Sequence, residues 1–186
     1  MLLTLTGGAG AGKTTLAAAL AVTAPRVPVR VLHGDDYYFT GQGQGVWARD
    51  GAGIPRLDVG DPRSMDIERL NHDTDHALER AAIVIVDGLF ARHVCLREPH
   101  VRLDVFVDLP ADLRLVRKIQ RKCLRDGFPL EVLLQNYLNH RRDAHERHIE
   151  PARHHCDIAV DGAQAPATLA DQIWSMIAGN KLFDNS

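Results

Sequence analysis

The sequence lacks an excess of basic charge, a pair of closely spaced cysteines and any long apolar run. Its net charge is −2 at pH 7, so no basic field favours binding to nucleic acid or to an acidic membrane surface. No stretch approaches the roughly 18 apolar residues of a membrane span. Cys95, Cys123 and Cys156 form no C-x-x-C pair, which is typical of free thiols in a reducing compartment. We therefore expect a cytoplasmic protein that binds neither nucleic acid nor membranes.

The chain does contain an alternation of strand-like and helix-like segments. Strands are expected at residues 2–6, 29–33, 83–86, 103–109 and 157–160. Helices are expected at residues 14–22, 66–80, 111–126, 130–147 and 167–178. This alternation is typical of an α/β fold with a parallel sheet. Because 186 residues most simply form one domain, we expect a single domain over residues 1–186 with a parallel five-stranded sheet.

A glycine-rich stretch directly follows the first expected strand. Gly7-Gly8-Ala9-Gly10-Ala11-Gly12-Lys13-Thr14 fits the P-loop pattern G-x-x-x-x-G-K-[ST]. Its glycines let the backbone aim N–H groups at phosphate oxygens, its lysine reaches the β/γ-phosphates, and its threonine hydroxyl ligates Mg²⁺. The motif predicts a three-layer P-loop NTPase fold with ATP and Mg²⁺ as cofactors. The ATP-binding residues are then expected to be Gly7, Gly8, Ala9, Gly10, Ala11, Gly12, Lys13, Thr14 and Thr15.

Carboxylates follow two of the expected strands. Asp35 comes directly after residues 29–33, with Asp36 as a neighbour that is easily mistaken for it, and Asp87 ends the apolar run at 83–86. Phosphoryl transfer to an alcohol needs a base that accepts the hydroxyl proton and carboxylates that help to hold the metal. We predict Asp35 as the catalytic base, with Thr14, Asp35 and Asp87 as metal ligands.

Four arginines fall in one stripe of the helix expected at 111–126, namely Arg114, Arg117, Arg121 and Arg125. No glutamate partners them at i+4, and a hinge-like Asp126-Gly127-Phe128-Pro129 follows. A helix that closes over a triphosphate needs arginines to offset the charge of the transferring group. We predict a helical lid at about residues 111–129, with Arg117 and Arg121 as catalytic and ATP-binding residues. The alternative is a solvated basic face.

Two further segments have distinctive compositions. The glycine-rich segment at 40–57 contains a plausible hairpin, in which Val46-Trp47-Ala48 turns through Asp50-Gly51-Ala52-Gly53 toward Ile54. Since it follows a strand at the edge where α/β sheets bind ligands, we expect a substrate loop. The histidine-rich stretch near His145-Glu146-Arg147-His148 lacks the spacing of H-E-x-x-H, so we expect solvated histidines there.

Taken in order, these motifs resemble the uridine kinase / phosphoribulokinase group of P-loop kinases, which includes nicotinamide riboside kinases. The resemblance runs from about residue 2 to residue 162. It implies that Asp35, the first residue of a D-[DS]-[FY]-[FY] motif, is the base and that Tyr38 lines the acceptor site. An aspartate that binds sugar hydroxyls falls on Asp58, with Asp61 as the next match. Further acceptor residues implied by a Y-x-x-x-R motif are Tyr137 and Arg141.

The resemblance has one departure, because the hairpin that uridine kinases carry between the helix at 66–80 and the strand at 83–86 is missing here. We expect residues 46–54 to be a local substitute for that hairpin. The implied activity is ATP- and Mg²⁺-dependent phosphorylation of a hydroxyl on a nucleoside- or sugar-like small molecule. Two alternatives stay open, a nucleoside monophosphate kinase that uses Arg56, Arg63 and Arg92, and a non-catalytic nucleotide-binding module. The sequence leaves the acceptor and the choice between monomer and homo-oligomer undetermined.

Overall fold

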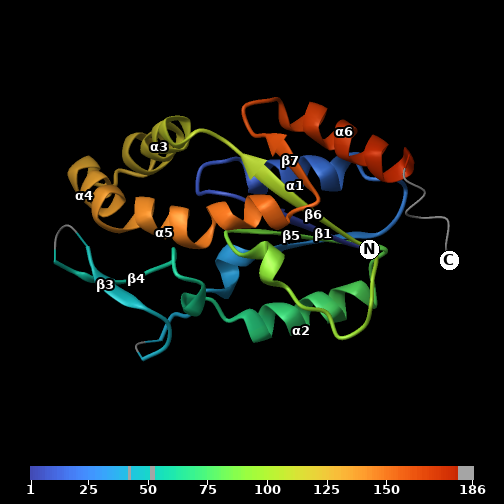
Figure 1. The fold of residues 1–186 in the computed structure, drawn as a ribbon, viewed down its shortest axis with the longest axis horizontal. Helices are drawn as coiled ribbons and strands as arrows, with labels where there is room; N and C mark the ends of the chain where they lie inside the picture. Colours follow the sequence, from blue (N-terminus) through green and yellow to red (C-terminus); the bar gives the residue numbers. More distant parts are fainter. Residues whose placement is uncertain (42, 51–52, 180–186) are drawn as a thin grey trace.

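A central parallel sheet organises the computed structural model, which describes residues 1–41, 43–50 and 53–179 (Figure 1). The strand order is β2-β5-β1-β6-β7, and every neighbouring pair is parallel. The strands are β1 (Leu2–Thr6), β2 (Val29–His33), β5 (Ile83–Gly88), β6 (Arg102–Asp108) and β7 (Ile158–Asp161). The predicted five-stranded parallel sheet is therefore confirmed, with strand ends within two residues of those expected.

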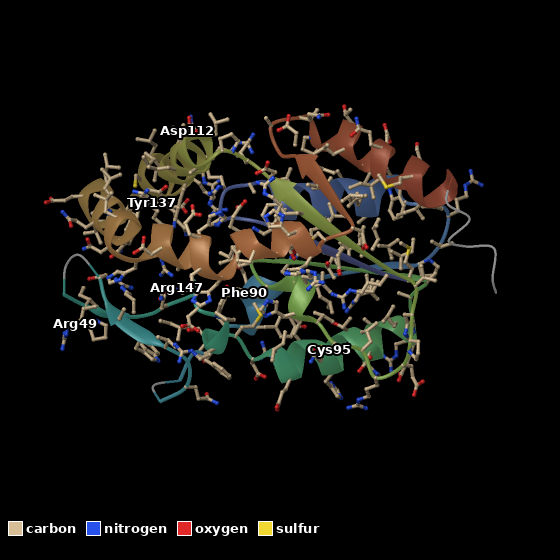
Figure 2. The ribbon with its side chains drawn as sticks, in the orientation of Figure 1. Arg49, Phe90, Cys95, Asp112, Tyr137 and Arg147 are labelled. Carbon is tan, nitrogen blue, oxygen red and sulfur yellow. The ribbon has the colours of Figure 1, made fainter. Side chains whose placement is uncertain are left out.

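Helices cover both faces of the sheet and make the fold three-layered (Figure 1). α1 (Lys13–Thr23) and α6 (Pro166–Gly179) pack together on one face, and α2 (Ile67–Leu78) lies on the other. Alternate residues of a strand point to opposite faces, so Ile83 and Ile85 join the first core while Val84 and Val86 join the second. Phe90, labelled in Figure 2, lies in the layer between the sheet and α2.

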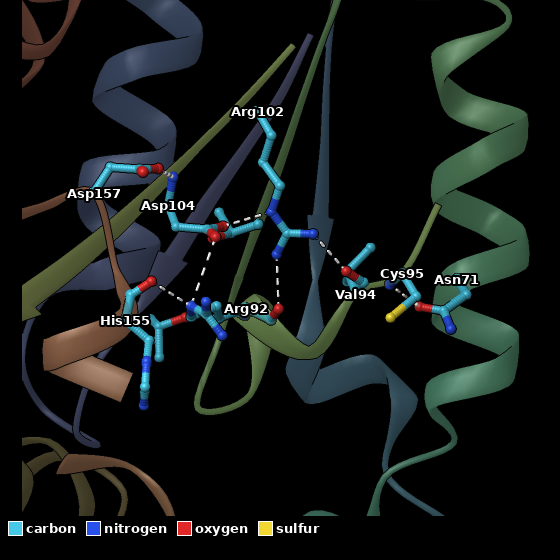
Figure 3. A network of polar contacts seen from close by, with 10 residues as sticks. Asn71, Arg92, Val94, Cys95, Arg102, Asp104, His155 and Asp157 are labelled. Carbon is cyan, nitrogen blue, oxygen red and sulfur yellow. Dashed lines mark hydrogen bonds and ion pairs between the residues drawn. The ribbon is translucent and has the colours of Figure 1, made fainter. Parts of the chain in front are cut away.

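A polar network fixes the segment that follows β5 (Figure 3). The guanidinium of Arg102 donates to the carbonyl of Arg92 at 2.7 Å and to the carboxylate of Asp104 at 2.8 Å. Arg92 in turn donates to the carbonyl of His155 at 2.7 Å. These charge-assisted bonds tie the short helix Ala91–His93 to β6 and to the segment before β7.

A helical arm, termed the cap (residues 111–148), extends beyond the sheet. It contains α3 (Ala111–Ile119), α4 (Leu130–Asn136) and α5 (Arg142–His148), with π-helical turns at Gln120–Arg125 and Tyr137–Arg141. The continuous helices expected at 111–126 and 130–147 thus each change to i→i+5 hydrogen bonding along part of their length. The break expected after residue 125 is present, with Gly127 at a φ of +71°.

An antiparallel hairpin lies beneath the cap, apart from the main sheet (Figure 1). It pairs β3 (Trp47–Arg49) with β4 (Pro55–Leu57), as the sequence predicts. Gly51 and Ala52 of its expected turn lie outside the described residues. None of the helices in the described ranges combines the length and apolar character that crossing a bilayer requires.

Candidate active site

The glycine-rich loop connects the end of β1 to the start of α1. Gly10 and Gly12 have φ values of +89° and +105°, a region that favours glycine. The Lys13 side chain folds back over the loop, and its Nζ donates to the carbonyls of Gly7 at 2.8 Å and Gly8 at 3.0 Å. Burial lowers the pKa of Lys13 to about 8, against the opposing effects of Asp35 and Asp87. The loop therefore holds an internally bound ammonium beside its N–H groups.

The arginines of α3, Arg114 and Arg117, lie against this loop and the segment beside it. A Cβ atom at Gly10 would lie 2.7 Å from the carbonyl oxygen of Arg114, so the close approach of α3 requires glycine. Arg117 donates to the carbonyl of Gly162 at 3.0 Å, and Arg117 and Arg121 line the same cleft as the loop. The structure therefore places both arginines of this predicted pair at the cleft. Arg125, by contrast, forms a surface ion pair with Asp126.

The carboxylate of Asp87 is held by two neighbours. The Thr14 hydroxyl donates to its Oδ2 at 2.5 Å, and His33 Nδ1 donates to its Oδ1 at 2.6 Å. Asp87 is only 3% exposed. His33 is absent from the residues predicted from the sequence, although its signal is simple. His33 is the last residue of β2, and Asp87 lies next to the last residue of β5. The two strands are adjacent and parallel, and their register places His33 beside Asp87.

Asp35 and Asp36 begin the turn after β2, in the short helix Gly34–Tyr37. Both line the cleft, but their charges act on different groups. The charge of Asp35 opposes the lowering of the Lys13 pKa, and after burial it is the main cause that raises the pKa of Tyr38. Asp36 acts instead on Tyr37. The charge of Asp35, and not that of Asp36, therefore acts on the lysine of the glycine-rich loop.

The residues beyond Asp35 form the far wall of the site. The Tyr38 hydroxyl donates to the carbonyl of Val59 at 2.9 Å, and Arg141 donates to Asp58 at 2.5 Å. Asp58 and Arg141 line one cavity, and Arg141 lines a second with Tyr137. Asp61 accepts hydrogen bonds from the backbone and guanidinium of Arg63. Of the two aspartates predicted for acceptor binding, Asp58 lies in a cavity wall, while Asp61 caps a short helix.

The arginines required by the nucleoside monophosphate kinase alternative do not converge. Arg56 pairs with Asp50 at 3.0 Å, and Arg63 pairs with Asp61 at 2.8 Å. Arg92 belongs to the polar network of Figure 3. A site for an acceptor phosphate needs several cations that point to one place. These three arginines instead bind partners in three different parts of the protein.

The main cleft has a volume of about 750 Å³, which is in the range of small-molecule sites. It extends from Asp35 and Tyr38, across the glycine-rich loop, to Gln164 and Pro166. Asp87 and the Thr14 hydroxyl offer the hard oxygen donors that suit Mg²⁺, which takes few protein ligands when phosphates supply the others. No separate group of three or more histidine, cysteine or acidic side chains suited to a metal occurs within the described part of the chain.

Comparisons with known proteins place the chain in a family. The sequence model of the Phosphoribulokinase / Uridine kinase family matches residues 58–168, more than half of the chain. The chain is 27% identical to a uridine kinase of Staphylococcus epidermidis, over 84% of each protein. It is 28% identical to a uridine kinase of Deinococcus deserti, over 87% of this chain and 88% of that protein.

Among solved structures, the fold is similar to that of shikimate kinase from Acinetobacter baumannii in complex with shikimate. The TM-score is 0.58 at 20% identity, covering 97% of this chain and 94% of the other. The family match begins at residue 58, so the glycine-rich loop, His33 and Asp35 are observations independent of it.

Proposed function

The chain belongs to the phosphoribulokinase / uridine kinase family, and we propose that it transfers the γ-phosphoryl group of ATP, with Mg²⁺, to a hydroxyl of a nucleoside- or sugar-like acceptor. The chain is a kinase with a P-loop nucleotide-binding fold. The observation that carries the proposal is that Lys13, Thr14, Asp87 and Asp35 line one cleft. Groups suited to phosphate, metal and proton chemistry therefore meet at one edge of the sheet.

The donor half of the proposed site is the loop with β5. The loop N–H groups and Lys13 would bind the phosphates, and Thr14 with Asp87 would hold Mg²⁺. When bound, the metal offsets charge on the β- and γ-phosphates. The bonds from Thr14 and His33 fix the position of both Asp87 carboxylate oxygens, which favours a rigid metal site.

The acceptor half of the proposed site starts at Asp35. This carboxylate would accept the proton of the acceptor hydroxyl while the hydroxyl oxygen bonds to the γ-phosphorus and the bond to ADP breaks. Tyr38 and Asp58, with Arg141 and Tyr137, would orient the acceptor.

The cap supplies the remaining charge. We propose that residues 111–129 act as a lid, whose Arg117 and Arg121 offset the charge of the transferring group. Closing the lid would exclude water and so suppress hydrolysis of ATP. The bond from Arg117 to the carbonyl of Gly162 already joins the cap to the loop before α6.

The experiment that tests this function measures ADP release over a panel of nucleosides, ribosides, sugars, polyols and nucleoside monophosphates, with ATP and Mg²⁺ alone as the control. We expect at least one hydroxyl compound to raise ADP release well above that control. Stimulation by nucleoside monophosphates alone would identify a nucleoside monophosphate kinase. Calorimetric binding of ATP with no acceptor-stimulated release would identify a non-catalytic module.

A further inference from the structure

A small cavity of about 70 Å³ lies under the cap and is lined by basic groups. Arg114 and Lys118 come from α3, His145 comes from α5, and Arg141 comes from the turn before it. No aspartate or glutamate of the described residues lines this cavity. Its remaining polar side chain is that of Tyr137, which Figure 2 labels in the angle enclosed by α3, α4 and α5. Because Arg141 pairs with Asp58 at 2.5 Å, the uncompensated positive charge of the wall comes from Arg114 and Lys118.

Lys118 is half-buried and has no acidic partner in the part of the chain that the structure describes. Burial and the charges of Arg141, Arg121 and Lys122 lower the pKa of its ammonium to about 8. Arg114 donates to the carbonyl of Leu109 at 2.9 Å and has no salt bridge within the described ranges. Burial lowers its pKa, and the charges of Glu150, Glu146 and Asp108 oppose this effect from a distance. A cluster of cations of this kind is stabilised by an anion placed between them.

His145 contributes an unsatisfied polar atom to the same cavity. The residue is 8% exposed, and its Nε2 lies 3.2 Å from Oε2 of Glu150. Because a carboxylate only accepts, Nε2 carries the hydrogen and Nδ1 of the neutral ring presents a lone pair. This Nδ1 is buried and has no hydrogen-bond partner among the described residues. A buried acceptor of this kind calls for a donor, such as a hydroxyl group.

The cavity adjoins the main cleft, in which phosphoryl transfer is proposed to occur. It shares Ala9 of the glycine-rich loop, Val59, Leu89 and Lys118 with the main cleft, and Arg141 with the cavity that contains Asp58. It therefore lies on the acceptor side of the glycine-rich loop. A group bound there belongs to the same molecule as the hydroxyl that faces Asp35, or to a second small anion next to it.

We propose that the acceptor is a polyhydroxylated anion, a sugar acid or a sugar phosphate, whose anionic group binds Lys118 and Arg114 and whose hydroxyl donates to His145 Nδ1. This inference rests on the proposed kinase function and narrows its acceptor. An uncharged nucleoside would leave two cations of this cavity without an anion. Carboxylate and phosphate share the required chemistry.

The first test compares matched acceptors by kcat/KM for ADP release. The pairs are D-gluconate with D-glucitol and D-ribose 5-phosphate with D-ribose, so that one pair tests a carboxylate and the other a phosphate. We expect the anionic member of at least one pair to be favoured by about tenfold or more, as for a charge-assisted hydrogen bond. Lys118→Met should remove that preference. Lys122→Met, one turn further along and paired with Asp126, should keep it.

The second test uses inorganic phosphate and does not depend on turnover. With the glycine-rich loop saturated by AMP-PNP and Mg²⁺, calorimetry should still detect phosphate binding to the native chain and to Lys122→Met, and should detect none to Lys118→Met. This result supports the inference even if no tested acceptor is phosphorylated.

Two results would overturn the inference. The first is an equal or greater kcat/KM for both neutral acceptors, which would leave the kinase function in place. The second is the absence of phosphate binding to the native chain once AMP-PNP is saturating, which would make this set of cations part of the donor site only.

Discussion

The hydroxyl of Thr14 donates a 2.5 Å hydrogen bond to Oδ2 of Asp87, a residue 73 positions away in the sequence. The bond joins the first turn of α1 to the end of β5. It places the two proposed metal ligands side by side and holds Asp87 from one side while His33 holds it from the other. Because the donors lie on different elements, the position of this carboxylate depends on the packing of the sheet as a whole.

Replacing His33 tests whether this arrangement serves the metal. His33→Leu should raise the Mg²⁺ concentration for half-maximal ADP release by about tenfold, since loss of a group that orients a ligand commonly costs this much. His33→Asn, which retains a donor, should recover part of the loss. The matched control is His76→Leu, an exposed histidine beside Glu79. A Mg²⁺ dependence of His33→Leu that equals the native one would contradict the positioning role.

Replacing Gly10 tests how closely α3 must approach the loop. Gly10→Ala combines a φ of +89° with a Cβ only 2.7 Å from a backbone oxygen, and we expect it to lower the free energy of unfolding by about 2–4 kcal/mol. Gly127→Ala shares the positive φ, but its added Cβ would meet no atom of the described residues within 4 Å, so it should cost about 1–2 kcal/mol. Urea unfolding measures both. Equal losses would mean that the contact with Arg114 adds nothing.

The buried ammonium of Lys13 predicts a pH dependence of stability. Its pKa is lowered from 10.5 to about 8 in the folded chain, so between these values the unfolded chain binds more protons than the folded one. The free energy of unfolding of the nucleotide-free protein should therefore gain a contribution from Lys13 as the pH rises from 8 toward 10.5. Urea unfolding at several pH values should show a smaller rise for Lys13→Met. An identical pH profile for the two proteins would contradict the lowered pKa.

Much of the fold was predictable because buried parallel strands are short, continuous apolar runs. β1, which is buried along its whole length, has the bounds that the sequence predicts. The contact of His33 with Asp87 was not predictable in this way, since it arises from the register of two strands that are distant in sequence. The packing of Arg114 on the glycine-rich loop was not predictable either. The spacing of the arginines shows that they share one face of the helix, but it does not show which part of the protein packs against that face.

The Nδ1 of His145, which has no hydrogen-bond partner among the described residues, could not be predicted from the sequence, because its burial also depends on tertiary packing. The sequence predicts solvated histidines in this stretch, and that expectation is wrong for His145, which is buried in the small cavity that α3 and α5 line. Which histidine of this histidine-rich stretch is buried depends on the rotation of α5 about its axis. The π-helical turn at Tyr137–Arg141 alters that rotation relative to a continuous helix.

The proposed base can be tested directly by comparing two adjacent carboxylates. Once an acceptor has been found, Asp35→Asn and Asp36→Asn are compared by kcat for acceptor-dependent ADP release and by calorimetric binding of ATP. We expect Asp35→Asn to bind ATP and to lose about 100-fold or more in kcat, a loss typical of a removed general base, and Asp36→Asn to retain most of its turnover. Near-native turnover by Asp35→Asn would contradict the assignment of Asp35 and, with it, the proposed organisation of the acceptor site.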